Sequence, residues 1–268
     1  MYKRQILLLL FLLFYTAYQF LPILKVVKQE FSWNTLKGET EEIGNNFYYL
    51  GSNSFHYLTL KNLGKIKEEF VLILIDAHSD LSPHTEKVNC GSWVNFALKL
   101  HRVKKVIWLG GSLGIKNEAN NWINFFWIKK RKFFVFPAYS FRSYFKVKEK
   151  KIAKNFKDWK EGKNVRFDKL GNFFGFPGIY LYWFTYKEAI KEGILKELID
   201  KDKIFISIDL DVLEEKEAYP TPWGNGLLSW KDLLQIVDYL QDNFEILGWD
   251  ICGPEEGLRR FLKYEEKI

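Results

Sequence analysis

Acidic and imidazole side chains stand at two places where an apolar run of the sequence ends. In "VLILIDAHSD" the run is followed by Asp76, His78 and Asp80. In "FISIDLD" a second run ends in Asp209 and Asp211. Carboxylates and neutral imidazoles are metal ligands, and buried together without cations they would repel one another strongly. The pattern therefore predicts a site for divalent metal ions, and a pair of such ions could ionise a bridging water.

Apolar runs that alternate with amphipathic segments must place these side chains. The expected strands are residues 47–51, 70–76, 104–111, 132–136, 178–184, 203–211 and 245–251. The expected helices are residues 92–102, 185–202 and 229–243, with Ser229 as an N-cap, and a last helix follows. Continuous apolar strands separated by helices predict a parallel sheet covered on both faces. Both acidic motifs stand at carboxyl ends of strands, where such sheets bind ligands.

The two motifs also resemble a known family. "DAHSD" and "SIDLDVL" are similar to the two signature motifs of the arginase–agmatinase (ureohydrolase) superfamily, and "AYPTPWGNGLLSWKDLLQIV" resembles the turn and helix that follow the second motif. The resemblance covers roughly residues 45–260. It implies an arginase-like, three-layer α/β/α fold with a mainly parallel sheet, in a metallohydrolase domain over residues 45–268.

The resemblance also implies the ligands of a two-metal site. The degenerate segment "YYLGSNSFHYLTL" stands where the family has a metal-binding His and supplies His56, whose alternative role is to cap a helix start. The implied ligands are His56, Asp76, His78, Asp80, Asp209 and Asp211. Asp76 and Asp209 would bridge two ions, with His56 and Asp80 on one and His78 and Asp211 on the other. The expected ions are Mn²⁺, with Zn²⁺ or Fe²⁺ as alternatives, and Asp80 would also orient the hydroxide.

The sequence departs from the family at the residues that handle substrate. Cys90 replaces the His of a His-Gly pair used in proton transfer, and Cys252 or Gly253 replaces a Glu on the final strand that holds the guanidinium. Glu255 and Glu256 come two or three residues late. We therefore expect the water-activating half of the site to be kept and the guanidine-reading half to be lost. Cys90, together with Cys252, is a candidate replacement for the lost groups; the alternatives are two inert buried thiols or a disulfide.

The N-terminus predicts a separate membrane element. Residues 6–24 carry no charge and follow Lys3 and Arg4. This length suits a bilayer span, so residues 1–30 are expected to form a membrane anchor or signal-like helix. A retained anchor is favoured over a cleaved signal peptide or a core helix. The charges that flank the span conflict and leave the side of the membrane open.

The net charge of +7 is concentrated between Lys129 and Arg166. This stretch mixes cations with aromatic residues, which suits either an anionic surface or an ordinary solvated face. Nucleic acid is not the expected partner, because no nucleic-acid-binding module accompanies the stretch.

The leading hypothesis is a binuclear metal-dependent hydrolase of a non-peptide C–N bond of the amidine or amide type. A metal-bridging hydroxide would attack a small-molecule substrate. The alternatives are a membrane-tethered metal-binding or interaction module without turnover, and a deacetylase of acylated amines. A metallophosphoesterase is disfavoured because its further motifs are absent.

Overall fold

The computed structural model describes residues 36–44, 46–82, 87–112, 127, 130–139, 185–218 and 220–265. No helix within these ranges has the length and apolar character needed to cross a membrane. The predicted N-terminal element, the expected strand at 178–184 and most of the basic stretch lie outside the described residues. The expectations for those segments stay predictions.

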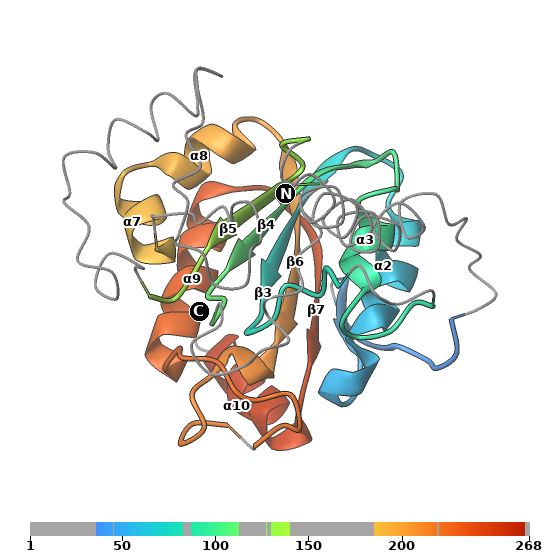
Figure 1. The fold of residues 1–268 in the computed structure, drawn as a ribbon, viewed down its shortest axis with the longest axis vertical. Helices are drawn as coiled ribbons and strands as arrows, with labels where there is room; N and C mark the ends of the chain where they lie inside the picture. The colour runs from blue at the N-terminus through green and yellow to red at the C-terminus, as the bar shows by residue number, and fades with distance from the viewer. Residues whose placement is uncertain are drawn as a thin grey trace, which may run out of the picture.

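One mixed, mostly parallel sheet forms the centre of the described chain (Figure 1). Its strands lie in the order β1-β2-β7-β6-β3-β4-β5, and β1 and β2 are the antiparallel pair. Their bounds are β1 (Glu41–Gly44), β2 (Phe47–Tyr49), β3 (Phe70–Ile75), β4 (Val103–Leu109), β5 (Phe133–Phe136), β6 (Lys203–Asp209) and β7 (Ile246–Cys252). The expectation of a mainly parallel sheet is confirmed.

Helices cover both faces of this sheet, with α2 and α3 on one side in Figure 1 and α7, α8 and α9 on the other. The helices are α2 (Thr59–Lys65), α3 (Trp93–Ala97), α7 (Tyr186–Lys191), α8 (Ile194–Ile199), α9 (Trp230–Asn243) and α10 (Glu255–Glu265). Two 3₁₀ turns, η2 (Asn53–Leu58) and η4 (Leu210–Val212), lie beside the sheet's carboxyl ends. The layers therefore follow the predicted α/β/α arrangement.

The apolar run of β3 explains why the sheet is covered on both faces. All six of its residues are buried. Ile73 packs in one core cluster with Leu233 of α9, whereas Leu72 packs in a second cluster with Trp93 of α3. Because successive side chains of a strand point to opposite faces, a central strand with two covered faces must be apolar throughout.

Several expected boundaries are wrong, for local reasons. The helix expected over 185–202 is two helices, because Gly193 lies between them with φ of 70°, a left-handed conformation that suits glycine. The helix expected over 92–102 ends at Ala97. Ser229 caps α9 as predicted, since its side chain accepts a hydrogen bond from the backbone N–H of Asp232. The sequence reasoning missed β1, η2 and α2.

Candidate metal centre

The two acidic motifs lie side by side because their strands are neighbours in the sheet. β3 and β6 pair in parallel, with Ile75 opposite Ile208, so the residues that follow them leave the sheet at the same edge. Asp76 follows β3 directly, and Asp209 is the last residue of β6. The expectation that both motifs meet at carboxyl ends of strands is confirmed.

The first motif folds as a tight loop rather than as a continuing strand. The backbone N–H of His78 donates to Asp76 Oδ1 at 2.6 Å. Asp80 lies in the left-handed region with φ of 47°, which Asp tolerates better than most residues. Asp80 Oδ2 accepts a hydrogen bond of 2.7 Å from the buried indole N–H of Trp93. These local bonds hold the side chains of the motif in one cluster.

The second motif turns at the end of β6. Asp209 Oδ1 accepts hydrogen bonds from the Asp211 backbone N–H at 2.9 Å and from the Asn53 amide. The "GNGLL" segment packs against this turn. The Gly226 N–H donates a hydrogen bond of 2.6 Å to the backbone carbonyl of Asp211. A Cβ at Gly226 would lie 2.0 Å from Val212 O, so no side chain fits at this position.

His56 of η2 completes one half of the site and is fully buried. Its Nδ1 lies 3.2 Å from Asp76 Oδ2, 2.9 Å from Asp80 Oδ2 and 3.5 Å from Asp209 Oδ2. The ring of Trp93 packs against the imidazole at 4.9 Å between centroids. The sequence suggested His56 only through a degenerate pattern. The fold brings it to its expected partners Asp76, Asp80 and Asp209.

His78 forms the other half, and Asp76 serves both halves. His78 Nδ1 lies 2.9 Å from Asp211 Oδ2 and 3.6 Å from Asp76 Oδ1. Asp76 therefore turns one oxygen toward each histidine, as a bridging carboxylate would. Asp209 directs Oδ2 toward His56, while its Oδ1 is held by Asn53 and the Asp211 N–H. Bridging by Asp209 stays a prediction.

The donor set fits divalent cations. His78 Nε2 lies 3.1 Å from the carbonyl of Trp223, which can only accept a hydrogen bond, so this nitrogen carries the proton. Nδ1 of neutral His78 then presents a lone pair to carboxylates. In the other half, His56 Nδ1 lies within 3.5 Å of oxygens from Asp76, Asp80 and Asp209. Carboxylates and an imidazole this close need positive charge among them, either a proton on the ring or a metal ion.

The pKa directions show how crowded the negative charge is. Burial, together with the charge of Asp76, raises the pKa of Asp80 to about 7 despite the opposing contact with His56. Burial and the charge of Asp209 also hold the pKa of Asp211 well above its usual range. Burial alone would lower the pKa of His78, but Asp211 and Asp76 outweigh it and raise the value to about 12. Without metal the cluster therefore takes up protons where cations would otherwise sit.

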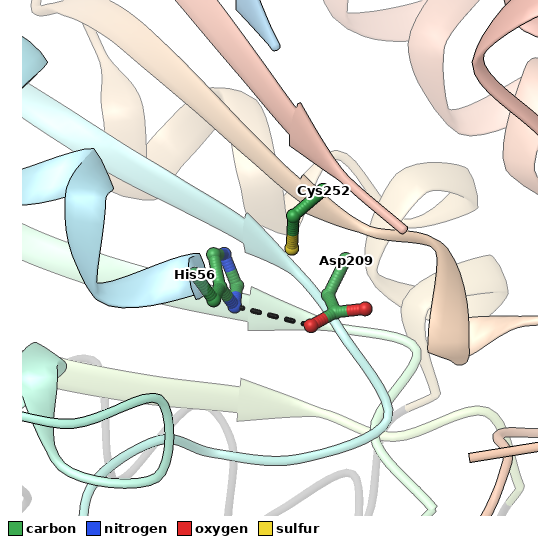
Figure 2. Close-up of side chains that lie close together, drawn as sticks. All are labelled: His56, Asp209 and Cys252. Carbon is green, nitrogen blue, oxygen red and sulfur yellow. Dashed lines mark ion pairs between the residues drawn. The ribbon is translucent and has the colours of Figure 1, made fainter. Parts of the chain in front are cut away.

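The two cysteines differ in burial and in their position relative to the ligand cluster. Cys252 is fully buried at the end of β7, and Figure 2 shows its sulfur beside His56 and Asp209. One ligand atom from each of these three side chains lies within 4.8 Å of the others. Cys90 is half-buried, and burial together with the charge of Asp80 raises its pKa to about 11, so the thiol stays protonated at neutral pH. Both thiols are free, which makes the disulfide alternative wrong.

No carboxylate of α10 replaces the missing family Glu within the described residues. The side chains of Glu255 and Glu256 are exposed, and Glu255 pairs with Arg259 at 2.6 Å on the surface. Asp250 of β7 is a buried acid on the final strand. Its carboxylate accepts a hydrogen bond from Ser207 and is not one of the proposed metal ligands. The loss of a guanidine-reading carboxylate on the final strand stays a prediction.

Sequence reasoning missed several residues that support the ligands. They are Asn53, Trp93, Ser207, Trp223 and Asp250. Ser207 and Asp250 carried a readable signal, since each is a polar residue inside an otherwise apolar strand, and such residues need buried partners. Trp93 and Asn53 gave no comparable signal, because their role depends on contacts between distant parts of the chain.

Comparisons with known proteins give the following similarities. No family model matches the chain. A curated relative, an uncharacterised protein of Thermotoga maritima, is 27% identical over 218 residues, which are 81% of this chain and 61% of the relative. Among solved structures, a formimidoylglutamase from Bacillus subtilis aligns with a TM-score of 0.47 and 24% identity over 76% of this chain and 51% of its own.

An arginase from Bacillus caldovelox aligns with a TM-score of 0.45 and 16% identity, over 77% of this chain and 60% of its own. The chain spans between 51% and 61% of the length of these three proteins.

Proposed function

We propose that the chain is a hydrolase that uses two divalent metal ions to cleave a non-peptide C–N bond of the amidine or amide type in a small molecule. The observation that carries the proposal is the pair of histidine Nδ1 atoms, one fully buried and one partly buried, that face carboxylates and are linked by Asp76. His56, Asp76, Asp80 and Asp209 would hold one ion, and Asp76, His78 and Asp211 the other. The carboxylate-rich set favours Mn²⁺, with Zn²⁺ or Fe²⁺ as alternatives.

The bound ions would supply Lewis acidity and lower the pKa of the attacking water. The protein's own groups would orient that water and move its proton. Asp80 is the group we assign to this task, because its carboxylate lies at the His56 end of the cluster and is fixed by the Trp93 indole. Hydrolysis adds the water oxygen to the substrate carbon, and the proton leaves with the departing nitrogen.

Cys90 is proposed to contact the substrate or the leaving group. Its thiol is half-buried, and burial together with the charge of Asp80 raises its pKa. A protonated thiol can donate a proton or a weak hydrogen bond, but it is a poor nucleophile. A role as a neutral donor is therefore favoured over covalent catalysis.

Metal analysis and a substrate screen test the proposal together. The chain, loaded with Mn²⁺ or Zn²⁺ and freed of excess ions, is expected to hold two ions per chain. Amidines, ureas and acetylated polyamines are then screened for released ammonia, urea or amine. Turnover of one of these compounds supports the proposal, and its product assigns the bond.

Matched histidine variants connect turnover to the cluster. His56→Asn is expected to lose the ion on its side and the activity with it. His101→Asn changes an exposed histidine outside the cluster and is expected to behave like the parent. Two bound ions with no turnover on any compound would favour a metal-binding module, and a chain that takes up no divalent ion would contradict the site itself.

A further inference from the structure

A second buried polar cluster lies directly beneath His56, on the side away from the proposed ions. Its members are Thr59, Asn62, Ser207 and Asp250, each at most 1% exposed. The pairing of β6 with β7 places Ser207 opposite Asp250, one side-chain level below the pair Asp209 and Cys252. His56 therefore contacts two levels of the sheet, one with each ring nitrogen.

The carboxylate of Asp250 lies among neutral donors from two elements, β6 and α2. Ser207 Oγ donates to Oδ1 at 2.6 Å. Thr59 Oγ1 lies 3.2 Å from the same oxygen, but its one proton has a shorter bond of 2.8 Å to the His56 carbonyl. Asn62 Nδ2 donates to Oδ2 at 3.1 Å. Burying a carboxylate among neutral groups lowers the stability of the fold. Asp250 is linked through Ser207 to His56, and so to the proposed metal site, by two hydrogen bonds.

The direction of that chain determines where His56 carries its proton. A serine hydroxyl has one proton, and the short bond to Asp250 uses it. The Ser207 oxygen, 2.9 Å from His56 Nε2, must then accept from that nitrogen. With the proton on Nε2, Nδ1 of the neutral ring keeps its lone pair and turns it toward Asp76 and Asp80.

We propose that Ser207 and Asp250 are positioning residues, which fix His56 as the Nε2–H tautomer and so present Nδ1 to a divalent cation. The inference rests on the proposed metal-dependent function and deepens it. A carboxylate behind a metal-binding imidazole orients the ring and makes it a stronger donor. Here the carboxylate acts through a serine hydroxyl.

The other histidine provides an internal comparison. His78 Nε2 lies 3.1 Å from the backbone carbonyl of Trp223, so no side chain of the Asp250 cluster fixes its tautomer. Changes at Ser207 or Asp250 should therefore weaken the ion beside His56 and spare the ion beside His78. An equal loss of both ions would contradict this selective role.

The test reads the imidazole protons in the Zn²⁺-loaded chain. The sequence has four histidines, which keeps long-range ¹H–¹⁵N spectra of the rings readable, and His56→Gln assigns the signal of interest. The expected result is a proton on His56 Nε2 and a metal-shifted Nδ1. If Ser207 instead donates to the ring, the proton will lie on His56 Nδ1. That result, in the parent chain alone, would overturn the inference.

Variants then measure the effect on Zn²⁺ binding. Ser207→Ala and Asp250→Asn are expected to weaken one of the two ions by about 10–100-fold, the effect typical of partners behind a ligand. Ser207→Thr keeps the hydroxyl and should restore most of the affinity. Thr59→Val removes another hydroxyl of the cluster, one that contacts Asp250, Ser207 and the His56 carbonyl but not the His56 ring, and it is expected to have a clearly smaller effect.

The possible failures can be told apart. If the parent binds two Zn²⁺ ions and Ser207→Ala binds both equally well with an unchanged His56 spectrum, the positioning role is wrong and the metal site stands. If Thr59→Val weakens the same ion as much as Ser207→Ala, the cluster supports packing only. If the parent binds no Zn²⁺, the proposed function and the positioning role fail together.

Discussion

Asp76 Oδ2 lies 3.2 Å from His56 Nδ1, and both side chains are buried. A carboxylate and an imidazole in this position need a proton or a metal ion between them. The other oxygen of Asp76 lies 3.6 Å from Nδ1 of the second histidine, His78. One carboxylate therefore joins the two halves of the cluster, and the following changes test what depends on it.

Replacing Asp76 should have the largest effect. Asp76→Asn removes the charge that both halves share, so we expect the loss of at least one ion and a fall in activity of more than about 100-fold, beyond that typical of supporting residues. Metal content and turnover measure these effects. Asp202→Asn is the control, because Asp202 pairs with Lys104 on the surface. Retention of both ions in Asp76→Asn would rule out a bridging role.

Trp93→Phe tests how much the indole N–H contributes to Asp80. The change keeps an aromatic ring beside His56 but removes the 2.7 Å bond to the carboxylate. Such charge-assisted bonds contribute about 1.5–3 kcal/mol, so a free carboxylate should reduce turnover by roughly tenfold or more. Trp108→Phe is the matched control, because its indole donates to the backbone carbonyl of Asp76. Equal activity in the two variants would argue against a role for the Trp93 bond.

Stability should depend on pH through Asp232 of α9. Its carboxylate accepts hydrogen bonds from Ser229 and lies 2.7 Å from Lys187 Nζ. Burial alone would raise its pKa, but Lys187 and Ser229 outweigh burial and lower the pKa to about 2 from 3.8. A lowered folded-state pKa gives stability that is complete above about pH 4 and is lost as the pH falls toward 2.

Asp232→Asn should therefore lower the free energy of unfolding by about 0.5–1 kcal/mol at pH 7, allowing for the exposure of Lys187. The difference from the parent should shrink between pH 4 and pH 3. Urea unfolding at pH 7 and pH 3 measures it. A difference that is the same at both values would mean that the charge of Asp232 contributes nothing.

The thiols should differ in their reaction with a water-soluble disulfide reagent. Cys90 is half-buried and Cys252 is fully buried, and both are free. We expect slow labelling of one thiol in the native chain, labelling of both after denaturation, and no change with prior reduction. Cys90→Ser should abolish the native labelling. Labelling of Cys252 at the same rate as Cys90 would contradict the packing at the end of β7.

Apolar patterning located the buried strands of the described sheet, because burial on two faces leaves little choice of side chain, but it missed the exposed strand β1. β3, β4 and β6 fall close to their expected ranges. Boundaries were less predictable, since Gly193 ends α7 only in the conformation that the fold gives it. The first turn and helix, η2 and α2, were missed because "SNSFHYLTLKNLGK" has mixed polarity, and its buried side is decided by β6 and β7.

For the site, the sequence by itself determined which groups are candidate ligands. Carboxylates and imidazoles next to the ends of apolar strands must lie at one edge of a parallel sheet, and this follows from strand order and local geometry. Asp76, His78, Asp80, Asp209 and Asp211 were found that way, whereas His56 came from the resemblance of its segment to a family pattern.

Only the tertiary structure decided how these groups are held. Proton positions depend on atoms from distant segments: Ser207 and Asp250 behind His56, Trp223 behind His78, and Trp93 behind Asp80. Hydrogen bonds act over about 3 Å, whereas these partners are separated by 13 to 151 residues along the chain. Only folding brings such partners together. The pattern of residues along the sequence therefore does not determine which group donates and which accepts each hydrogen bond.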